Sequence, residues 1–181
     1  KQGSEILGIP VISKEDCYRL YPNNNFCIAI GDNAVRERVA KEISDVLPNA
    51  KFPSLIHQSS VIGIASRVGK GSVVMPQANV GPNSSIGEFC IINTSSSIDH
   101  DCAINDYASI APGVITGGSV SIGKRSAISI GAIVKHGLVI GDDVVIGANS
   151  YVHSSVANNF VAYGSPCKVV RDRKKGDGYL S

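Results

Sequence analysis

Aliphatic residues recur at every sixth position from Ile56 to Val152, and only Thr116 interrupts the column. Its members are Ile56, Ile62, Val68, Val74, Val80, Ile86, Ile92, Ile98, Ile104, Ile110, Thr116, Ile122, Ile128, Val134, Ile140, Ile146 and Val152. An α-helix cannot hold this repeat on one face, because six residues make about 1.7 turns. A short strand followed by a tight corner can hold this six-residue repeat on one face. The column therefore predicts a mainly β fold, a parallel β-helix of hexapeptide repeats with one hexad per side of a triangular coil.

A second column lies two residues before the first and is mostly small, for example Ser72, Ala78 and Ser84. Glycine often follows the aliphatic residue. We expect the aliphatic side chain to point inward, the small residue to fit near a corner, and glycine to serve where the corner needs unusual backbone angles. Seventeen uninterrupted hexads predict nearly six coils and a rod of roughly 27 Å. Since such rods cover their open ends and flat faces with terminal elements and further copies, we expect an oligomer.

Residues 1–52 follow a different pattern, and we treat them as a separate domain from the β-helix of residues 53–181, which ends in a cap from about Val156. Short strands are predicted at Ile6 to Ile12 and Phe26 to Ile30. Helical spacing then predicts a helix from Asn33 to Leu47, capped by Asp32 or Asn33. The apolar positions with that spacing are Val35, Val39, Ile43 and Leu47. We expect a small α/β, Rossmann-like unit, truncated because its Gly-rich first turn is absent.

Composition excludes several classes of protein. The formal charge of +2 gives no electrostatic case for nucleic acid, and no apolar run is long enough for a membrane-spanning helix. The five cysteines are scattered and show no CxxC pair, as expected for reduced thiols in a cytoplasmic protein. The chain begins at Lys1 rather than Met, so we expect residues upstream of it.

Three segments carry a family resemblance in addition to the hexads: Ile92 to Asp101, Ile110 to Gly113 and Gly164 to Pro166. Together they resemble the left-handed β-helix acetyltransferases that modify nucleotide-activated amino sugars, a layout that the sialic-acid O-acetyltransferase group shares. Ile28 to Asn33 is similar to the amino-terminal sugar-nucleotide domain of that family. The resemblance implies a left-handed coil, although the rule for parallel crossovers favours right-handed connections. It also implies a homotrimer and acetyl-CoA as co-substrate.

Acetyl transfer to an amine needs a base for the proton of the nucleophile and donors for the thioester oxygen. His100 is the expected base. In the family the carboxylate after the histidine orients the ring, which points to Asp101, while Asp99 stays open as an alternative. His100 could instead be an exposed corner residue. A metal site is not expected, because no companion His or Cys accompanies His100.

The resemblance assigns further contacts by position. The family's oxyanion donor is a glycine amide about one coil beyond the histidine, which matches Gly118, with Gly117 beside it; a tight corner would equally explain this glycine pair. Ile130 and Ala148 match the positions that contact acetyl-CoA. Ser109 stands where the family often has a second histidine at the cofactor. Its hydroxyl can donate a hydrogen bond but cannot become cationic.

For the acceptor only Gly31, in the turn before the predicted helix, can be carried over from the family's amino-terminal domain. Asn93 could bind the acceptor or merely stack with neighbouring Asn side chains. Cys90 and Cys102 fall in the small inward column, so packing explains them better than a nucleophilic role does. With no activated Ser or Cys beside the base, direct attack in a ternary complex is expected.

These features predict an enzyme that transfers acetyl from acetyl-CoA to the 4-amino group of a nucleotide-linked sugar, for bacterial surface glycan synthesis. O-acetylation of sialic acid or of another sugar hydroxyl is the nearest alternative. A non-catalytic hexapeptide scaffold is the alternative from a different class, and it would not need the residues around His100. The nucleotide and the sugar are not specified by the sequence.

Overall fold

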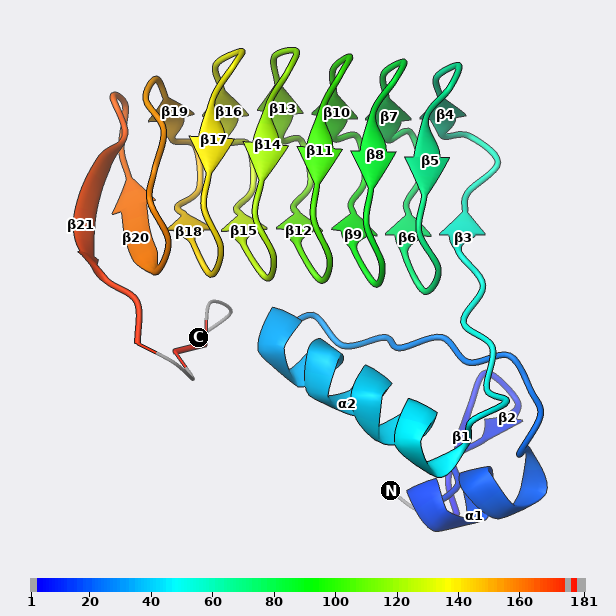
Figure 1. The fold of residues 1–181 in the computed structure, drawn as a ribbon. Coiled ribbons are helices and arrows are strands. Elements are labelled where there is room, and N and C mark those ends of the chain that lie inside the picture. Colours follow the sequence, from blue (N-terminus) through cyan, green and yellow to red (C-terminus); the bar gives the residue numbers. More distant parts are fainter. Residues whose placement is uncertain (1–2, 175–176, 179–181) are drawn as a thin grey trace.

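A computed structural model describes residues 3–174 and 177–178 of the chain. Its main part is a triangular coil of two-residue strands (Figure 1). In sequence order the coil strands are β3 (Leu55–Ile56), β4 (Val61–Ile62), β5 (Arg67–Val68), β6 (Val73–Val74), β7 (Asn79–Val80), β8 (Ser85–Ile86), β9 (Ile91–Ile92), β10 (Ser97–Ile98), β11 (Ala103–Ile104), β12 (Ser109–Ile110), β13 (Ile115–Thr116), β14 (Ser121–Ile122), β15 (Ala127–Ile128), β16 (Ile133–Val134), β17 (Val139–Ile140), β18 (Val145–Ile146) and β19 (Tyr151–Val152). Each strand ends on a member of the six-residue column, so the predicted hexads are confirmed.

The strands stack into three parallel sheets, which form the sides of the prism. One sheet has six strands in the order β19-β16-β13-β10-β7-β4, and another has five in the order β17-β14-β11-β8-β5. The third has eight, because β20 (Phe160–Tyr163) extends it beyond β18 in parallel and β21 (Lys168–Asp172) then pairs with β20 antiparallel. In Figure 1 the chain descends along β5 to β17 in front and rises behind while it advances from right to left, which makes the coil left-handed.

Three stacks of loops form the edges of the prism. The upper edge of Figure 1 joins the six-stranded to the five-stranded sheet and comprises residues 63–66, 81–84, 99–102, 117–120 and 135–138. The lower edge joins the five-stranded to the eight-stranded sheet at residues 69–72, 87–90, 105–108, 123–126 and 141–144. The third edge joins the eight-stranded to the six-stranded sheet and includes residues 93–96, 111–114, 129–132 and 147–150.

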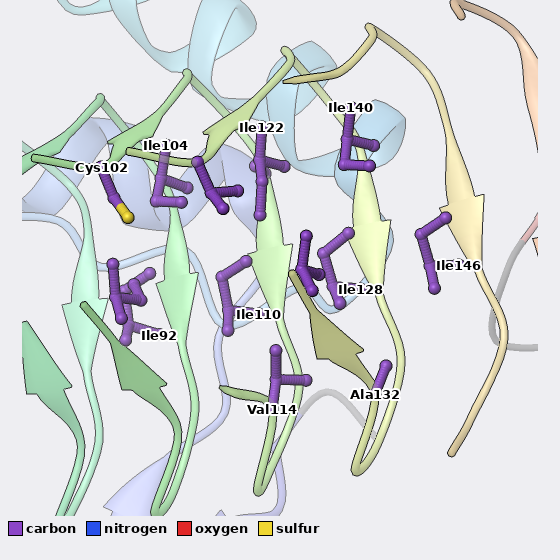
Figure 2. Packing of buried hydrophobic residues seen from close by; sticks show 14 of the residues in the cluster. Ile92, Cys102, Ile104, Ile110, Val114, Ile122, Ile128, Ala132, Ile140 and Ile146 are labelled. Atoms are coloured by element: carbon purple, nitrogen blue, oxygen red, sulfur yellow. The ribbon is translucent and has the colours of Figure 1, made fainter. Parts of the chain in front are cut away.

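The interior is filled by the two predicted columns (Figure 2). Ile92, Ile110, Ile128 and Ile146 stack at intervals of one coil, and each is at most 1% exposed. Thr116, the predicted exception, is also buried, and its hydroxyl accepts a hydrogen bond from the Asp99 N–H at 3.2 Å. The interior column thus tolerates one hydroxyl because that hydroxyl has a main-chain partner.

The small column is likewise inward, and its thiols are packing groups. Cys90 and Cys102 are at most 2% exposed. Burial raises the pKa of the Cys90 thiol to about 12, so it stays protonated near neutrality. This confirms the prediction that these cysteines pack rather than react.

The expected role of glycine is confirmed at corner glycines such as Gly113, whose φ is 67°, but it is wrong for the glycines that follow the aliphatic column. None of the glycines after the aliphatic column has a positive φ; the left-handed corner positions are mostly other residues, such as Asp101 and Tyr107. A Cβ on Gly69 would instead lie 2.5 Å from the carbonyl oxygen of Gly87 in the next coil. Glycine is therefore needed at this position because the backbones of successive coils approach closely.

The amino-terminal unit contains a hairpin and two helices. The hairpin pairs β1 (Glu5–Ile6) with β2 (Ile9–Pro10), and the helices are α1 (Lys14–Leu20) and α2 (Asn33–Val46). Asp32 caps α2 through its Oδ1, which accepts the N–H of Val35, as predicted. The expected strand from Phe26 to Ile30 is not formed, because no strand pairs along it in the described residues. Only a bridge between Asn25 and Lys51 holds its start.

Helix α2 lies along the lower edge of the coil (Figure 1). Ala40 and Ile43 pack in a cluster with Phe52, Phe89 and Tyr107. The rings of Phe89 and Tyr107, one coil apart, stack in parallel with centroids 5.2 Å apart. The amino-terminal unit and the coil therefore share a hydrophobic interface at the lower edge.

Candidate active site

His100 lies on the upper edge, in the loop between β10 and β11. Its Nδ1 is 2.7 Å from Oδ2 of Asp101. Asp101 adopts a left-handed φ of 56°, a conformation that Asp tolerates better than most residues, and its N–H donates to the Pro82 carbonyl. Because an ionised carboxylate only accepts hydrogen bonds, Nδ1 carries the proton and Nε2 of the neutral ring is left as the acceptor.

The two carboxylates that flank His100 do different things. Asp101 contacts the imidazole, whereas Oδ1 of Asp99 accepts the main-chain N–H of His100 at 2.8 Å. Of the two candidates for orienting the ring, the geometry brings only Asp101 to it. Asp99 supports the loop and adds negative charge nearby.

These contacts change the acid–base properties of the pair. The pKa of His100 is raised, first by the hydrogen bond to Asp101 and then by the negative charge of Asp99. The same hydrogen bond lowers the pKa of Asp101. The His100 side chain is 55% exposed, so solvent screens both effects. The arrangement provides a stronger than ordinary base in a fixed tautomer.

Gly118 lies beside the imidazole, one coil farther along the upper edge. A Cβ on Gly118 would be 2.5 Å from Cε1 and 2.6 Å from Nε2 of His100, so the ring occupies the space that a side chain would need. The Gly118 N–H makes no hydrogen bond within the described residues, whereas the N–H of Gly117 donates to Val134. Gly118 therefore combines room for the ring with a free main-chain donor next to it.

The other predicted site residues lie elsewhere. Asn93, Ile130 and Ala148 are on the third edge, where Ile130 is 59% exposed and Ala148 is exposed on the next coil. The N–H groups of Ile130 and Ala148 find no acceptor among the residues described. Asn93 accepts the N–H of Thr94 through its own side chain. This edge offers main-chain donors but is separate from His100.

Ser109 is buried against α2 rather than exposed on an edge. Its hydroxyl donates to Oδ1 of Asn33 at 2.6 Å and accepts from Arg36 at 3.2 Å. Gly31 lies just before α2, and its carbonyl accepts from Arg36. A direct contact between Ser109 and a cofactor stays a prediction, and the structure shows the hydroxyl engaged with α2.

Arg36 is the residue that the sequence analysis missed. It is 1% exposed and donates to the carbonyls of Ile30, Gly31, Phe89 and Tyr107 over 2.8–2.9 Å. A signal was present, because Arg36 shares one helix face with Ala40 and Ile43 rather than with the exposed charges. The guanidinium fixes the turn that contains Gly31 against the coil.

A cavity of about 900 Å³ lies below the lower edge, between α2 and the carboxyl-terminal segment. Its lining includes Glu37, Lys124, Arg125 and Arg173 but not His100. Burial alone would raise the pKa of Glu37, but hydrogen bonds from Lys124 and Lys41 outweigh it and lower the pKa to about 2. The His100 corner, by contrast, is an open surface in a single chain.

Metal and membrane features are not found in the part of the chain that the structure describes. No group of three or more His, Cys, Asp or Glu side chains there could hold a metal ion. None of the helices in residues 3–174 is long and apolar enough to cross a bilayer.

The chain is similar to several characterised proteins. It is 30% identical to perosamine N-acetyltransferase from Caulobacter crescentus, with a TM-score of 0.88 over 94% of this chain and 82% of that one. That protein was crystallised with CoA and GDP-perosamine in a form in which one histidine is replaced by asparagine. The acetyltransferase domain of PglB from Neisseria gonorrhoeae, in complex with acetyl coenzyme A, is 30% identical with a TM-score of 0.87, over 94% of this chain and 82% of that one.

Sequence comparison agrees with these structures. GDP-perosamine N-acetyltransferase of Escherichia coli O157:H7 is 30% identical over 148 residues, which make up 81% of this chain and 65% of that protein. The chain thus spans just under two thirds of the length of that relative. Residues 1–43 match the family model described as the PglD N-terminal domain. The chain belongs to the nucleotide-sugar N-acetyltransferase family of left-handed hexapeptide-repeat proteins.

Proposed function

We propose that this protein transfers the acetyl group of acetyl-CoA to the 4-amino group of a nucleotide-linked amino sugar, in the synthesis of bacterial surface glycans. The observation that carries the proposal is the Asp101–His100 pair beside the free N–H of Gly118. The complexes of relatives with CoA, acetyl coenzyme A and GDP-perosamine support it.

In the proposed reaction the neutral amine of the sugar attacks the thioester carbonyl carbon, and Nε2 of His100 accepts a proton from the amine as the C–N bond forms. Asp101 stabilises the resulting imidazolium through Nδ1. The Gly118 N–H donates to the oxygen that becomes anionic. When the C–S bond breaks, the CoA thiolate leaves and takes the proton from His100. The products are the amide and free CoA, and His100 is neutral again.

For acetyl-CoA we propose a path along the third edge, where the N–H groups of Ile130 and Ala148 are available as donors. Ser109 remains a proposed cofactor contact, and an indirect one through α2 fits its burial best. Gly31 directly precedes α2, which lies along the lower edge, whereas the loop between β10 and β11 that carries His100 is on the upper edge (Figure 1). We therefore propose that Gly31 and Asn93 of one copy serve the His100 of another.

The proposed homotrimer has a suitable surface on the six-stranded sheet. Ile115, Ile133 and Tyr151 are neighbours on successive coils of its outer face and are 48%, 45% and 41% exposed. Burying these three side chains against another copy would remove apolar surface from water. The second copy would also cover the open surface beside His100. The cysteines of the chain are all free, which supports the proposed cytoplasmic location.

O-acetylation of a sugar hydroxyl is the second candidate, and the raised pKa of His100 favours it, because a hydroxyl demands a stronger base than a neutral amine. Incubation with radiolabelled acetyl-CoA and matched 4-amino and 4-hydroxy nucleotide sugars separates the two. Label in an amide supports N-acetylation. Label found only in an alkali-labile ester would overturn it in favour of O-acetylation, and failure of acetyl-CoA to bind in calorimetry would favour a scaffold.

A further inference from the structure

The upper edge carries a column of corner residues with a left-handed backbone. Ala65, Asn83, Asp101 and Ser119 have φ values of 61°, 57°, 56° and 57°, and each lies one coil beyond the one before. The N–H groups of Asn83 and Asp101 donate to carbonyls of the preceding coil in the same way, both at 3.0 Å. Side chains at these positions therefore stand in register along the edge, about one strand spacing (~4.8 Å) apart.

Asn83 is the residue of this column that contacts Asp101 from the preceding coil. Its exposed side chain donates a hydrogen bond to the Asp101 carboxylate. Because an ionised carboxylate only accepts hydrogen bonds, the donor is Nδ2 of the Asn83 amide. The pKa of Asp101 is lowered first by the hydrogen bond with His100 and then, against the desolvation of the carboxylate, by this bond from Asn83. In the part of the chain that the structure describes, no third side chain donates to this carboxylate.

The base and its partner are thus contacted from two different coils. The imidazole of His100 lies over Gly118, where it fills the space that a side chain would need. The carboxylate of Asp101 is held by His100 on its own loop and by Asn83 on the loop before. The following coil bonds only the main chain of the base: the Ser119 N–H donates to the His100 carbonyl at 2.9 Å.

A second donor matters because the pair is exposed to water. The side chains of His100 and Asp101 are 55% and 50% exposed, so water competes for the carboxylate oxygens. An Asp side chain rotates about two bonds, and rotation away from His100 removes the acceptor of the Nδ1 proton. The proton can then occupy Nε2, the nitrogen that must accept the proton of the amine. A donor fixed to the preceding coil keeps the carboxylate turned toward the ring.

We propose, on the basis of the transferase function proposed above, that Asn83 is a positioning residue for the base. Its amide donates to Asp101 and holds the carboxylate in the orientation that keeps the proton of His100 on Nδ1. Asn83 touches neither the acceptor nor acetyl-CoA. It acts through Asp101, and its loss leaves a base that is present but less well oriented.

The test uses the full chain with Asn83→Ala, Asn83→Asp, and Asn83→Ala combined with Asp101→Ala. Alanine is accepted in this corner conformation, because Ala65 adopts it one coil earlier. Asn159→Ala is the matched control: Asn159 has a φ of 62°, is exposed, and lies just before β20 beyond the last coil. Circular dichroism melts verify that each variant folds.

Two readouts are needed. Steady-state kinetics with a nucleotide-linked 4-amino sugar and acetyl-CoA measure kcat and both KM values. Heteronuclear NMR of the imidazole groups, recorded well above the pKa of His100, measures which ring nitrogen carries the proton. The spectrum of His100→Ala identifies the signals of this residue among the four histidines of the chain.

We expect Asn83→Ala to lower kcat about three- to tenfold, less than the loss expected when the ring itself is displaced, with KM for acetyl-CoA within about twofold of the wild type. The NMR spectrum should show a larger fraction of the tautomer protonated at Nε2. In the Asp101→Ala background the same substitution should change kcat by less than about twofold, because Asn83 then has no carboxylate to hold. Asn159→Ala should leave kcat and the His100 signals as they are in the wild type.

Asn83→Asp separates the donor from the shape of the side chain. Asp has the size of Asn and adopts a left-handed φ more readily than Ala does, so a purely structural role for Asn83 predicts that Asn83→Asp is the better enzyme of the two. A carboxylate cannot donate and repels Asp101, so positioning predicts a kcat no higher than that of Asn83→Ala. Wild-type kcat in Asn83→Asp would overturn the proposal, as would an equal loss from Asn83→Ala with and without Asp101.

The NMR measurement needs no substrate, so failure of the underlying function looks different. A tautomer shift in Asn83→Ala, together with no acetyl transfer by the wild type, would leave the positioning contact standing and remove the transferase proposal. Acetyl transfer that Asn83→Ala performs at the wild-type rate and with unchanged imidazole signals would leave the transferase standing and remove the contact.

Discussion

Replacing Gly118 with Ala tests the active-site geometry with a single methyl group. The new Cβ would lie 2.5 Å from Cε1 of His100, whereas ordinary contact begins near 3.4 Å, so the ring must retreat by about 0.9 Å. A catalytic group misplaced by ~1 Å costs on the order of 10² in rate, equivalent to about 2.7 kcal/mol in the barrier. We expect kcat to fall by about that factor. The fold should persist, because the displaced ring is more than half exposed.

The assay is steady-state acetyl transfer to a nucleotide-linked 4-amino sugar that the wild type acetylates, monitored through the release of the CoA thiol from acetyl-CoA. The double variant Gly118→Ala with His100→Ala provides the control: once the ring is gone, the methyl group should cost at most a few-fold. A Gly118→Ala enzyme with wild-type kcat would show that the imidazole does not act from the position described. An equal loss in both backgrounds would place the effect on the Gly118 N–H instead.

Further changes probe the base, its partner, the interface and the interior. His100→Ala should lower kcat by ~10² to 10⁴ with an unchanged melting curve, and near-normal turnover would refute the base assignment. Because His100 must be neutral to accept a proton, kcat/KM should fall as the pH drops through the raised pKa of His100. Asp101→Asn removes the main cause of that rise, so the acidic limb of the kcat/KM profile should move to lower pH. An acidic limb that does not move would contradict the contact between His100 and Asp101. Arg36→Ala leaves four main-chain carbonyls without this donor and should destabilise the chain by about 3–5 kcal/mol in urea unfolding, whereas a loss under 1 kcal/mol would count against the role given to this contact. Ile110→Ala should cost about 2–5 kcal/mol in the same measurement, and a smaller loss would mean that the coil closes around the void.

The coil could be predicted almost residue by residue, because one column of side chains determines it. Every strand from β3 to β19 ends on a residue of that column, including Thr116. The hand could not be derived from the period, since six residues per side fit either hand. The roles of the glycines were also hidden, because a sequence does not show whether glycine supplies an unusual φ or a close approach.

The amino-terminal unit was less predictable. Helix α2 and its cap followed from periodicity, but α1 was missed although Ser13 and Asp16 form a capping pair at its start. Phe26 to Ile30 has a strand-like composition without a strand partner in the described residues, and pairing is a property of neighbours that composition does not contain. The same limit applies to Arg36 and Ser109, whose contacts join residues 73 positions apart.

Within the site, local motifs were predictable and long-range placement was not. The contact of His100 with Asp101 involves adjacent residues, so the sequence segment already contained it. Which of Gly31, Ile130 and Ala148 share a surface with His100 depends on which edge each occupies. The structure puts them on edges other than that of His100, so their roles stay predictions.

The left-handed corner positions of the lower edge have a consequence for how such proteins diversify. Phe89, Tyr107 and Arg125 occupy this conformation at one-coil intervals, and their side chains face the helical unit rather than the interior. Each of these three lower-edge hexads therefore carries one residue that packs inside the coil and one that contacts the amino-terminal unit. Substitutions at these corner positions change the contact with the amino-terminal unit and leave the interior column of the coil intact. The contact surface for an acceptor-binding domain can therefore vary independently of the coil.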